Sequence, residues 1–318
     1  MNAILVDFTE HKAGRSKKNK DLTREVQENH NTSADAGHYS QKLWPKKKKK
    51  ETKGLDPDHP IFRPYTIVGA AKKLHLEMTL PYNRAYDMLP IAKQKEYGDR
   101  MAALQEKLLA ACNAITYEVF RAAIETVREA HNGTFKAEMY PENREEFIED
   151  FAIGISYSPM PESSHFGQMN EEEKQKLISK FQQERRQIAA RATAHLKERL
   201  LKPVQSIIEK LSNPDARFHD VMMENIQNLV AMAPSLNLTG DLEVASAIED
   251  LSKGIANINI DALRDSVHYR DHAKSMANEF LTKYGGLGQR KFVQVEEPST
   301  VTPPVTLPET SSLPVITP

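Results

Sequence analysis

Apolar residues recur at three- and four-residue steps along two long stretches of this chain. The first stretch, residues 170–211, begins with Asn170, a good N-cap, and continues with glutamates that favour the positive end of a helix dipole. The spacing predicts one helix, roughly 60 Å long, which Pro203 should kink or divide. Its apolar face comprises Leu177, Phe181, Ile188, Ala192, Leu196, Leu200, Val204, Ile207 and Leu211.

The second stretch, residues 91–131, predicts a helix of similar length. Its apolar positions alternate steps of four and three, as in a coiled coil, and Asn132-Gly133 gives a C-terminal stop. Because a long apolar face needs an equally long partner, an antiparallel hairpin of the two helices is the simplest arrangement. The seam residues are Tyr97, Met101, Leu104, Leu108, Ala111, Ile115 and Val119.

Shorter elements fill the rest of the chain. Residues 152–158 alternate like a strand, and the only partner that the pattern offers is residues 291–295. We therefore predict an elongated all-α protein with at most a minor two-stranded β element. Helical spacing also occurs in residues 65–78, 142–151, 218–233, 242–252 and 261–284.

Charge and proline content divide the chain into three parts. Residues 1–54 carry 13 Lys and Arg against 7 Asp and Glu, although the whole chain has a net charge of −1. Their polar, aperiodic sequence predicts a disordered basic arm. Residues 55–288 are predicted to form the helical domain, and residues 289–318, rich in Pro, Ser and Thr, a disordered tail.

A lysine run near the end of the arm is the one candidate binding site. It comprises Lys46, Lys47, Lys48, Lys49 and Lys50 and follows Trp44-Pro45. Such a run can contact the phosphates of nucleic acid or an anionic surface. The alternative interpretation is a solvated arm that keeps the protein soluble.

Motifs for catalysis, cofactors and metals are absent from the sequence. The chain has no phosphate-binding loop, no H-E-x-x-H and no paired C-x-x-C. Asp265, His268 and His272 share a helical face, as metal ligands could, but we interpret them as an ordinary polar helix face. The single cysteine, Cys112, excludes an intramolecular disulfide and predicts a buried thiol in a reducing compartment. We expect a non-enzymatic protein without cofactors.

Membrane insertion is not expected either. No run of 18 apolar residues occurs, and the partly apolar start at residues 1–8 is too short for a signal-peptide core. These features predict a cytoplasmic protein without membrane partners.

Residues 79–82, the long helix that follows, and residues 151–161, 224–229 and 236–241 form a recognisable succession. Together they resemble an uncharacterised helical family, a domain of unknown function found in bacteriophages and in phage-like or plasmid-borne loci. The resemblance covers residues 55–252 and implies the cytoplasm of a bacterial host, but it assigns no catalytic residues. Genes of this kind can lie near an AAA+ ATPase of the MoxR type and a von Willebrand A-type protein, which implies these as partners.

Two functions follow as expectations. The first is a phage-type interaction or assembly protein that presents its long helices to a protein partner, such as an AAA+ ATPase. The alternative is a nucleic-acid-binding accessory protein that uses the basic arm. An enzyme with a site that sequence does not reveal is a third, less favoured interpretation.

Overall fold

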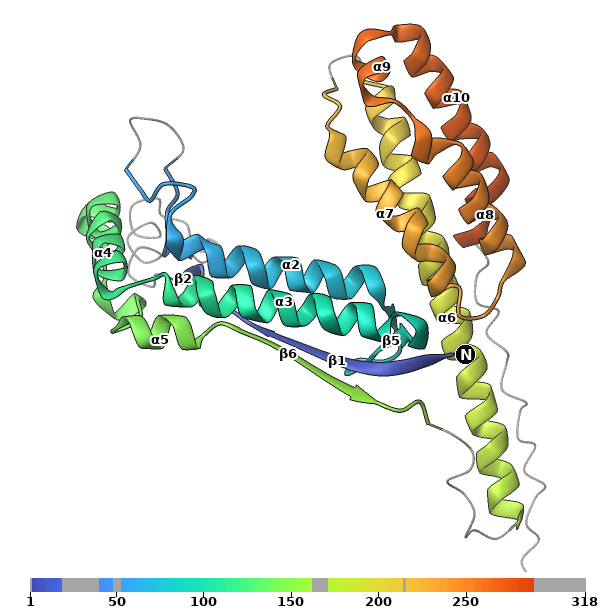
Figure 1. Cartoon of the computed structure of the whole chain (residues 1–318), viewed down its shortest axis with the longest axis horizontal. Helices are drawn as coiled ribbons and strands as arrows, with labels where there is room; N and C mark the ends of the chain where they lie inside the picture. The colour runs from blue at the N-terminus through green and yellow to red at the C-terminus, as the bar shows by residue number, and fades with distance from the viewer. Residues whose placement is uncertain (1, 19–39, 48–52, 162–170, 214–215, 289–318) are drawn as a thin grey trace, which may run out of the picture.

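The chain folds as a mixed α/β protein. Its structure, a computed structural model, describes residues 2–18, 40–47, 53–161, 171–213 and 216–288. Most of these residues are helical, but four antiparallel strands form one sheet in the order β4-β5-β1-β6 (Figure 1). The prediction of an all-α fold with at most two strands is therefore wrong. The strands are β1 (Ala3–His11), β4 (Leu80–Pro81), β5 (Asp87–Pro90) and β6 (Ala152–Ser158).

The helices form two groups that contact different parts of this sheet. In Figure 1, α2 and α3 lie along the sheet, whereas the helices that begin with α6 stand across its end. The first group contains α2 (Arg63–Met78), α3 (Gln94–Asn113), α4 (Tyr117–His131) and α5 (Arg144–Glu149). The second group contains α6 (Glu171–Leu211), α7 (Asp220–Leu236), α8 (Leu242–Lys253), α9 (Ile260–Asp265) and α10 (Val267–Tyr284).

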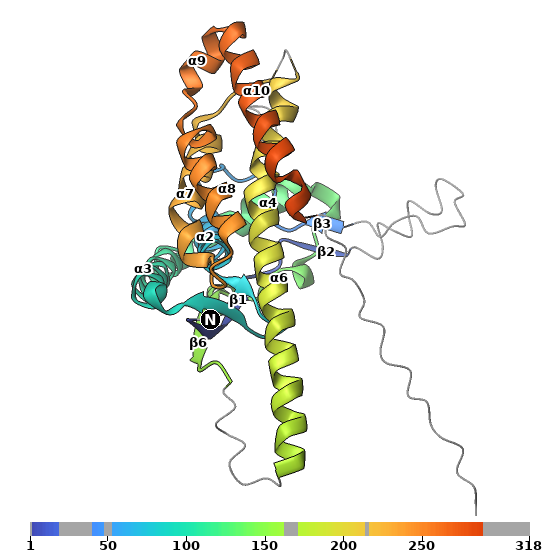
Figure 2. The same ribbon diagram turned by 90° about the vertical axis from the view of Figure 1, so that its right-hand side faces the viewer.

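The predicted long helix at residues 170–211 is confirmed as α6. It continues through Pro203, which does not end it. From Ile188 onward its apolar face is buried against α7, α8 and α10, and α10 is its main partner. Figure 2 shows the first part of α6 extending past the sheet.

The prediction of a second long helix is wrong, because residues 91–131 form two helices, α3 and α4. The helix is interrupted at Thr116, whose side chain caps α4 by accepting a hydrogen bond from the Val119 N–H. Arg144 donates to the carbonyl oxygens of Cys112 and Ile115 at this break, and the Cys112 carbonyl also accepts from the Ile115 N–H. The antiparallel hairpin is wrong as well, since α3 packs on α2 and α6 packs on α10.

The sheet lies between two hydrophobic cores. Leu5 and Met88 face the core of the α6 bundle, whereas their chain neighbours Val6 and Leu89 face the core built on α2 and α3. Successive side chains of a strand point to opposite faces, so both faces of β1 and β5 are covered at this end. The sheet therefore joins the two helical groups.

Strand β1 corrects the prediction for the N-terminal arm. Residues 3–11, predicted to be disordered, form an inner strand that pairs with β5 and β6. Residues 152–158 are a strand, as predicted, but their partner is β1. A small hairpin of β2 (Ser16–Lys18) and β3 (Ser40–Lys42) follows. Residues 19–39, 48–52 and the predicted tail and strand in 289–318 lie outside the described residues.

Most short helices occur where the pattern predicts them. Helices α2, α5, α7 and α8 agree with prediction within a few residues. The segment 261–284 divides into α9 and α10 because the Ser266 hydroxyl caps α10 by accepting from the Tyr269 N–H. Among the described helices, none combines the length and apolar composition that a membrane span requires.

Candidate functional site: a basic pocket beside the β2–β3 hairpin

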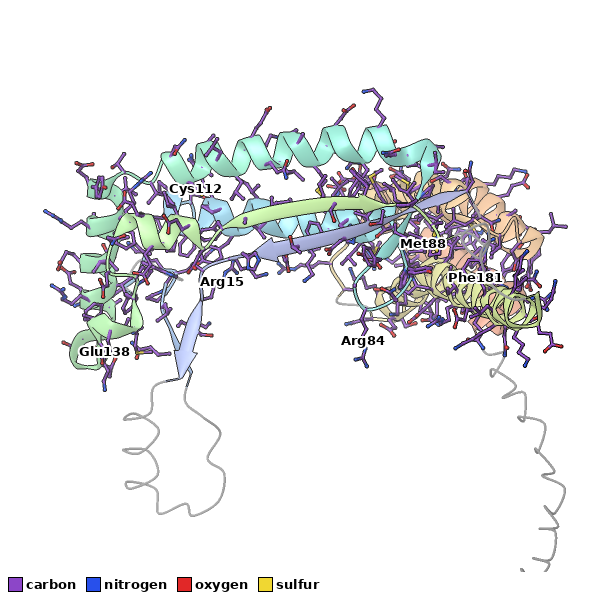
Figure 3. The ribbon with its side chains drawn as sticks, turned by 90° about the horizontal axis from the view of Figure 1, so that it is seen from below. Arg15, Arg84, Met88, Cys112, Glu138 and Phe181 are labelled. Carbon is purple, nitrogen blue, oxygen red and sulfur yellow. The ribbon has the colours of Figure 1, made fainter. Side chains whose placement is uncertain are left out.

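A cavity of about 830 Å³ lies beside the β2–β3 hairpin, and we call it the basic pocket. Its walls come from the β2–β3 hairpin, the loop that follows β3 and the start of α2. Figure 3 shows Arg15 at this end of the molecule, away from Met88 at the joint with the α6 bundle. The lining residues are Arg15, Ser16, Lys42, Trp44, Pro45, Lys46, Lys47, Pro57, Phe62 and Tyr65.

Backbone contacts hold the lysines of the pocket in place. The Lys47 N–H donates to the Leu55 carbonyl at 2.8 Å, and the Leu55 N–H donates to the Pro45 carbonyl at 2.9 Å. Gly54 makes this close approach feasible. Its φ is +150°, and a Cβ there would lie 2.8 Å from the Pro45 oxygen. Lys46 and Lys47 thus project from a braced loop, which lowers the entropy cost of binding a ligand.

The hairpin side of the pocket is anchored to α4. The His131 imidazole hydrogen-bonds to the Lys42 carbonyl oxygen at 2.9 Å, and the Leu43 N–H donates to the Arg15 carbonyl at 2.9 Å. Burial lowers the pKa of His131, which favours the neutral ring. Lys42 and Arg15 are therefore fixed beside Lys46 although they are distant in sequence.

Aromatic side chains form the floor of the pocket, and cations cover two of them. The Arg15 guanidinium carbon lies 4.3 Å from the centre of the Tyr65 ring, and Lys46 Nζ lies 4.3 Å from that of Phe62. Trp44 packs against Tyr140 and Phe147 in the core behind. Burial raises the pKa of Tyr65, so its hydroxyl stays protonated.

The described lining of the pocket is positively charged. Four cationic side chains line it, and none of its lining residues among those described is a carboxylate. Within the described part of the chain, no acidic group forms an ion pair with Arg15, Lys42, Lys46 or Lys47. Like charges held around one low-dielectric wall attract anions more strongly than the same charges spread over a surface. The site is suited to phosphate groups.

The pocket contains part of the lysine run that the sequence singles out. Lys46 and Lys47 line it, whereas Lys48, Lys49 and Lys50 lie outside the described residues. Sequence reasoning missed Arg15, Lys42 and the aromatic floor. The one available signal was Trp44-Pro45 next to the lysines, because an aromatic residue beside a basic run is typical of nucleic-acid contacts.

Comparisons with known proteins add no family. The chain matches no protein-family model, no curated protein and no solved structure. The resemblance to a phage family, with its implied partners and bacterial cytoplasm, therefore stays a prediction.

A buried polar network links helices α2 and α3 to strand β5. His75 is 3% exposed; its Nδ1 lies 2.8 Å from the Tyr97 hydroxyl and its Nε2 lies 2.7 Å from Asp87 Oδ2. The Phe8 ring stacks on the imidazole. Burial raises the pKa of Tyr97, which keeps its hydroxyl protonated. These four residues are separate from the lining of the basic pocket, and their geometry indicates a structural clamp.

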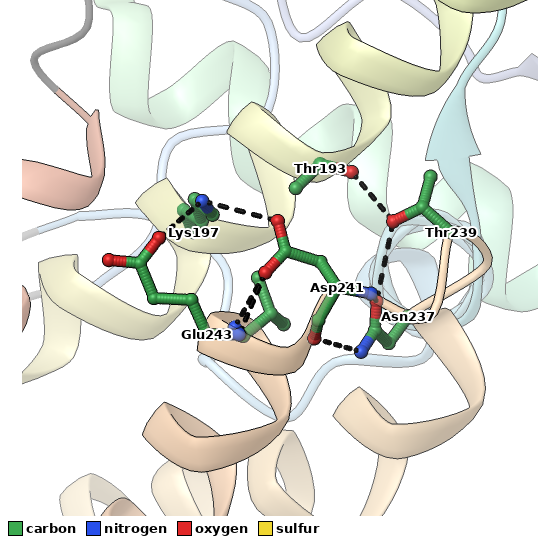
Figure 4. A network of polar contacts seen from close by, with 7 residues as sticks. Thr193, Lys197, Asn237, Thr239, Asp241 and Glu243 are labelled. Carbon is green, nitrogen blue, oxygen red and sulfur yellow. Dashed lines mark hydrogen bonds and ion pairs between the residues drawn. The ribbon is translucent and has the colours of Figure 1, made fainter.

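A second network explains the segment 236–241, one of those that carry the family resemblance (Figure 4). Asp241 caps α8 by accepting from the Glu243 and Val244 N–H groups, and Lys197 of α6 forms ion pairs with Asp241 and Glu243. Thr193 and Thr239 share a hydrogen bond of 2.9 Å. These contacts tie the α7–α8 turn to α6, so the motif has a structural role.

The remaining sequence candidates are structural too. Cys112 is buried, as predicted, and burial raises the pKa of its thiol, which makes it less reactive. Among the described residues, no group of three or more His, Cys, Asp or Glu side chains could hold a metal ion. Asp261 of α9 forms an ion pair with Arg264 at 2.8 Å.

His195 of α6 predicts a pH dependence of stability. Its pKa is lowered by burial and by Arg199, and its buried Nδ1 has no hydrogen-bond partner among the described residues. Because the folded state disfavours protonation, this group's contribution is complete above the unfolded pKa of about 6.5 and is lost as pH falls. We expect His195→Gln to reduce the drop in Tm between pH 7.5 and pH 5.5. An unchanged drop, measured by circular dichroism, would contradict this.

Proposed function

We propose that this protein binds nucleic acid through the basic pocket. The observation that carries the proposal is the gathering of Arg15, Lys42, Lys46 and Lys47 around one cavity whose described lining includes no carboxylate. Phosphate contacts by lysine and arginine supply most of the affinity of such complexes, and release of counterions makes the affinity salt-dependent.

The other expected function, a protein-assembly role, rests on the long helical seams, the absence of catalytic motifs and the family resemblance. In the folded chain the apolar face of α6 from Ile188 onward is covered by α7, α8 and α10, and the face of α3 is covered by α2. An AAA+ ATPase or von Willebrand A-type partner stays a prediction that rests on the resemblance.

Charge reversal in the pocket tests the proposal. In the double variant Lys42→Glu/Lys46→Glu, we expect the affinity for a fluorescently labelled 30-mer DNA to fall at least tenfold at about 100 mM salt. The slope of log K against log[salt] should decrease in magnitude by roughly 2, since each lost phosphate contact changes it by about 1. Fluorescence anisotropy across a salt series measures both quantities.

A matched variant controls for net charge. Lys107→Glu/Lys180→Glu changes the charge by the same amount at exposed positions on α3 and α6, outside the pocket. This variant should keep most of the affinity and the salt slope of the original protein. Equal losses in both double variants would mean that binding follows net charge alone and would overturn the proposal.

A further inference from the structure

We infer that the basic pocket is selective for single-stranded nucleic acid and holds an unpaired nucleotide, with its base against the aromatic floor and its phosphates at the cationic rim. This inference rests on the proposed function. The supporting observations are the composition of the walls, the size of the cavity and the two cation–aromatic contacts inside it.

The lining of the pocket combines an apolar, aromatic surface with a group of positively charged side chains. Trp44, Phe62 and Tyr65, with Pro45 and Pro57, supply an apolar surface, whereas Arg15, Lys42, Lys46 and Lys47 supply positive charge at the same opening. A duplex presents phosphates outside but keeps its bases stacked and paired, so it offers nothing for the apolar surface. A single strand presents both groups together.

The size of the cavity agrees with one nucleotide and its flanking phosphates. Pockets that enclose small ligands have volumes of about 300 to 1,000 Å³, and the basic pocket, at about 830 Å³, lies in this range. A double helix is far too wide to enter such a cavity. It would touch only the lysines at the rim, and its affinity would come from charge alone.

Arg15 and Lys46 can couple the binding of phosphates to the binding of a base, because their cationic groups cover two of the aromatic rings in the pocket. In the free protein their cationic groups lie over the rings of Tyr65 and Phe62. A phosphate forms charge-assisted hydrogen bonds with such groups, which are stronger than an exposed cation–π contact. When phosphates draw the two cations toward the rim, the ring surfaces become available to a base. Phosphate binding and base contact are therefore coupled.

The chain carries its own reporter for this event. Trp44 is its only tryptophan and lines the pocket, so intrinsic tryptophan fluorescence reports on occupancy. We expect a mixed-sequence single-stranded 12-mer to quench this fluorescence and to bind at least tenfold more tightly than its duplex at about 150 mM salt. The full chain is used, and anisotropy of the labelled DNA is followed in parallel.

A conservative variant separates base contact from charge. Phe62→Leu keeps an apolar side chain at a buried position but removes one ring face of the floor. We expect it to lower single-strand affinity three- to tenfold and duplex affinity by a smaller factor, with the salt slope retained for both ligands, because no charge is removed. Circular dichroism and thermal melting establish that the variant is folded. A second variant, Lys46→Gln, should reduce the salt slope for both ligands.

The outcomes distinguish the single-strand inference from the proposed function. Equal affinity for single strand and duplex without quenching would overturn the single-strand inference and leave the proposed function intact. Absence of binding to either DNA would overturn both. A free nucleotide such as AMP that binds as tightly as the 12-mer would also overturn the inference, because the site would then be a nucleotide pocket.

Discussion

Val6→Asp should unfold the protein or sharply lower its Tm. Val6 lies in β1, is 0% exposed and packs in the core under α2 and α3. A carboxylate without a partner at such a position costs roughly 3 to 5 kcal/mol, a large share of the 5 to 15 kcal/mol that stabilises a typical domain. Circular dichroism during heating measures the loss directly.

The same substitution at Thr9 is the matched control. Thr9 lies in the same strand but is exposed, so Thr9→Asp should change the Tm by only a few degrees. If Val6→Asp and Thr9→Asp melted alike, β1 would not be a buried inner strand.

Deletion of residues 1–54 would remove β1, so a loss of nucleic-acid binding after that deletion would report unfolding of the protein and not the loss of a binding site. Point variants of the pocket are the appropriate test.

His75→Ala is the second change for which we expect a large effect. It removes the hydrogen bonds to Tyr97 and Asp87 and the stacking with Phe8, and it leaves a buried tyrosine hydroxyl without its partner. The lost contacts and the cavity should cost about 3 kcal/mol. For a folded unit of this size the Tm should fall by roughly 6 to 12 °C.

A double-mutant cycle checks that the cost comes from this network. Tyr97→Phe alone removes one hydroxyl and should cost about 1 kcal/mol. In the double variant His75→Ala/Tyr97→Phe, the two losses should not add, because each single change already breaks the bond between the two side chains. Strictly additive losses in chemical denaturation would mean that the two residues do not interact. Nucleic-acid binding by the folded variants should be unaffected, since neither residue lines the basic pocket.

Helical periodicity was reliable where one helix face meets one core. The apolar spacing of residues 170–211 predicted α6 to within one residue, and the spacing of residues 65–78 and 242–252 predicted α2 and α8. At residues 91–131 the same signal spanned a break. Ile115 and Val119 continue the spacing, yet Thr116 caps a new helix between them. A single capping residue is a weak signal within a strong apolar pattern.

The strands were harder to predict for a physical reason. Residues 3–8 are too short for a signal-peptide core, but a short apolar run is also typical of a strand buried on both faces. Such a run has no alternation to reveal it, since Leu5 and Val6 are both buried, under different cores. Strands β4 and β5 are two and four residues long, too short for a periodic signal.

The candidate site shows the same division between local pattern and tertiary contact. The sequence by itself identified the lysine run, because adjacent like charges are visible in a linear pattern. It also determined the helical segments, whose periodicity is local. Only the tertiary structure decided that Arg15 and Lys42 join Lys46 around aromatic side chains, and that the first strand completes a sheet between two cores. Contacts between residues far apart in the chain depend on strand pairing and packing, and one sequence carries no local signal for them.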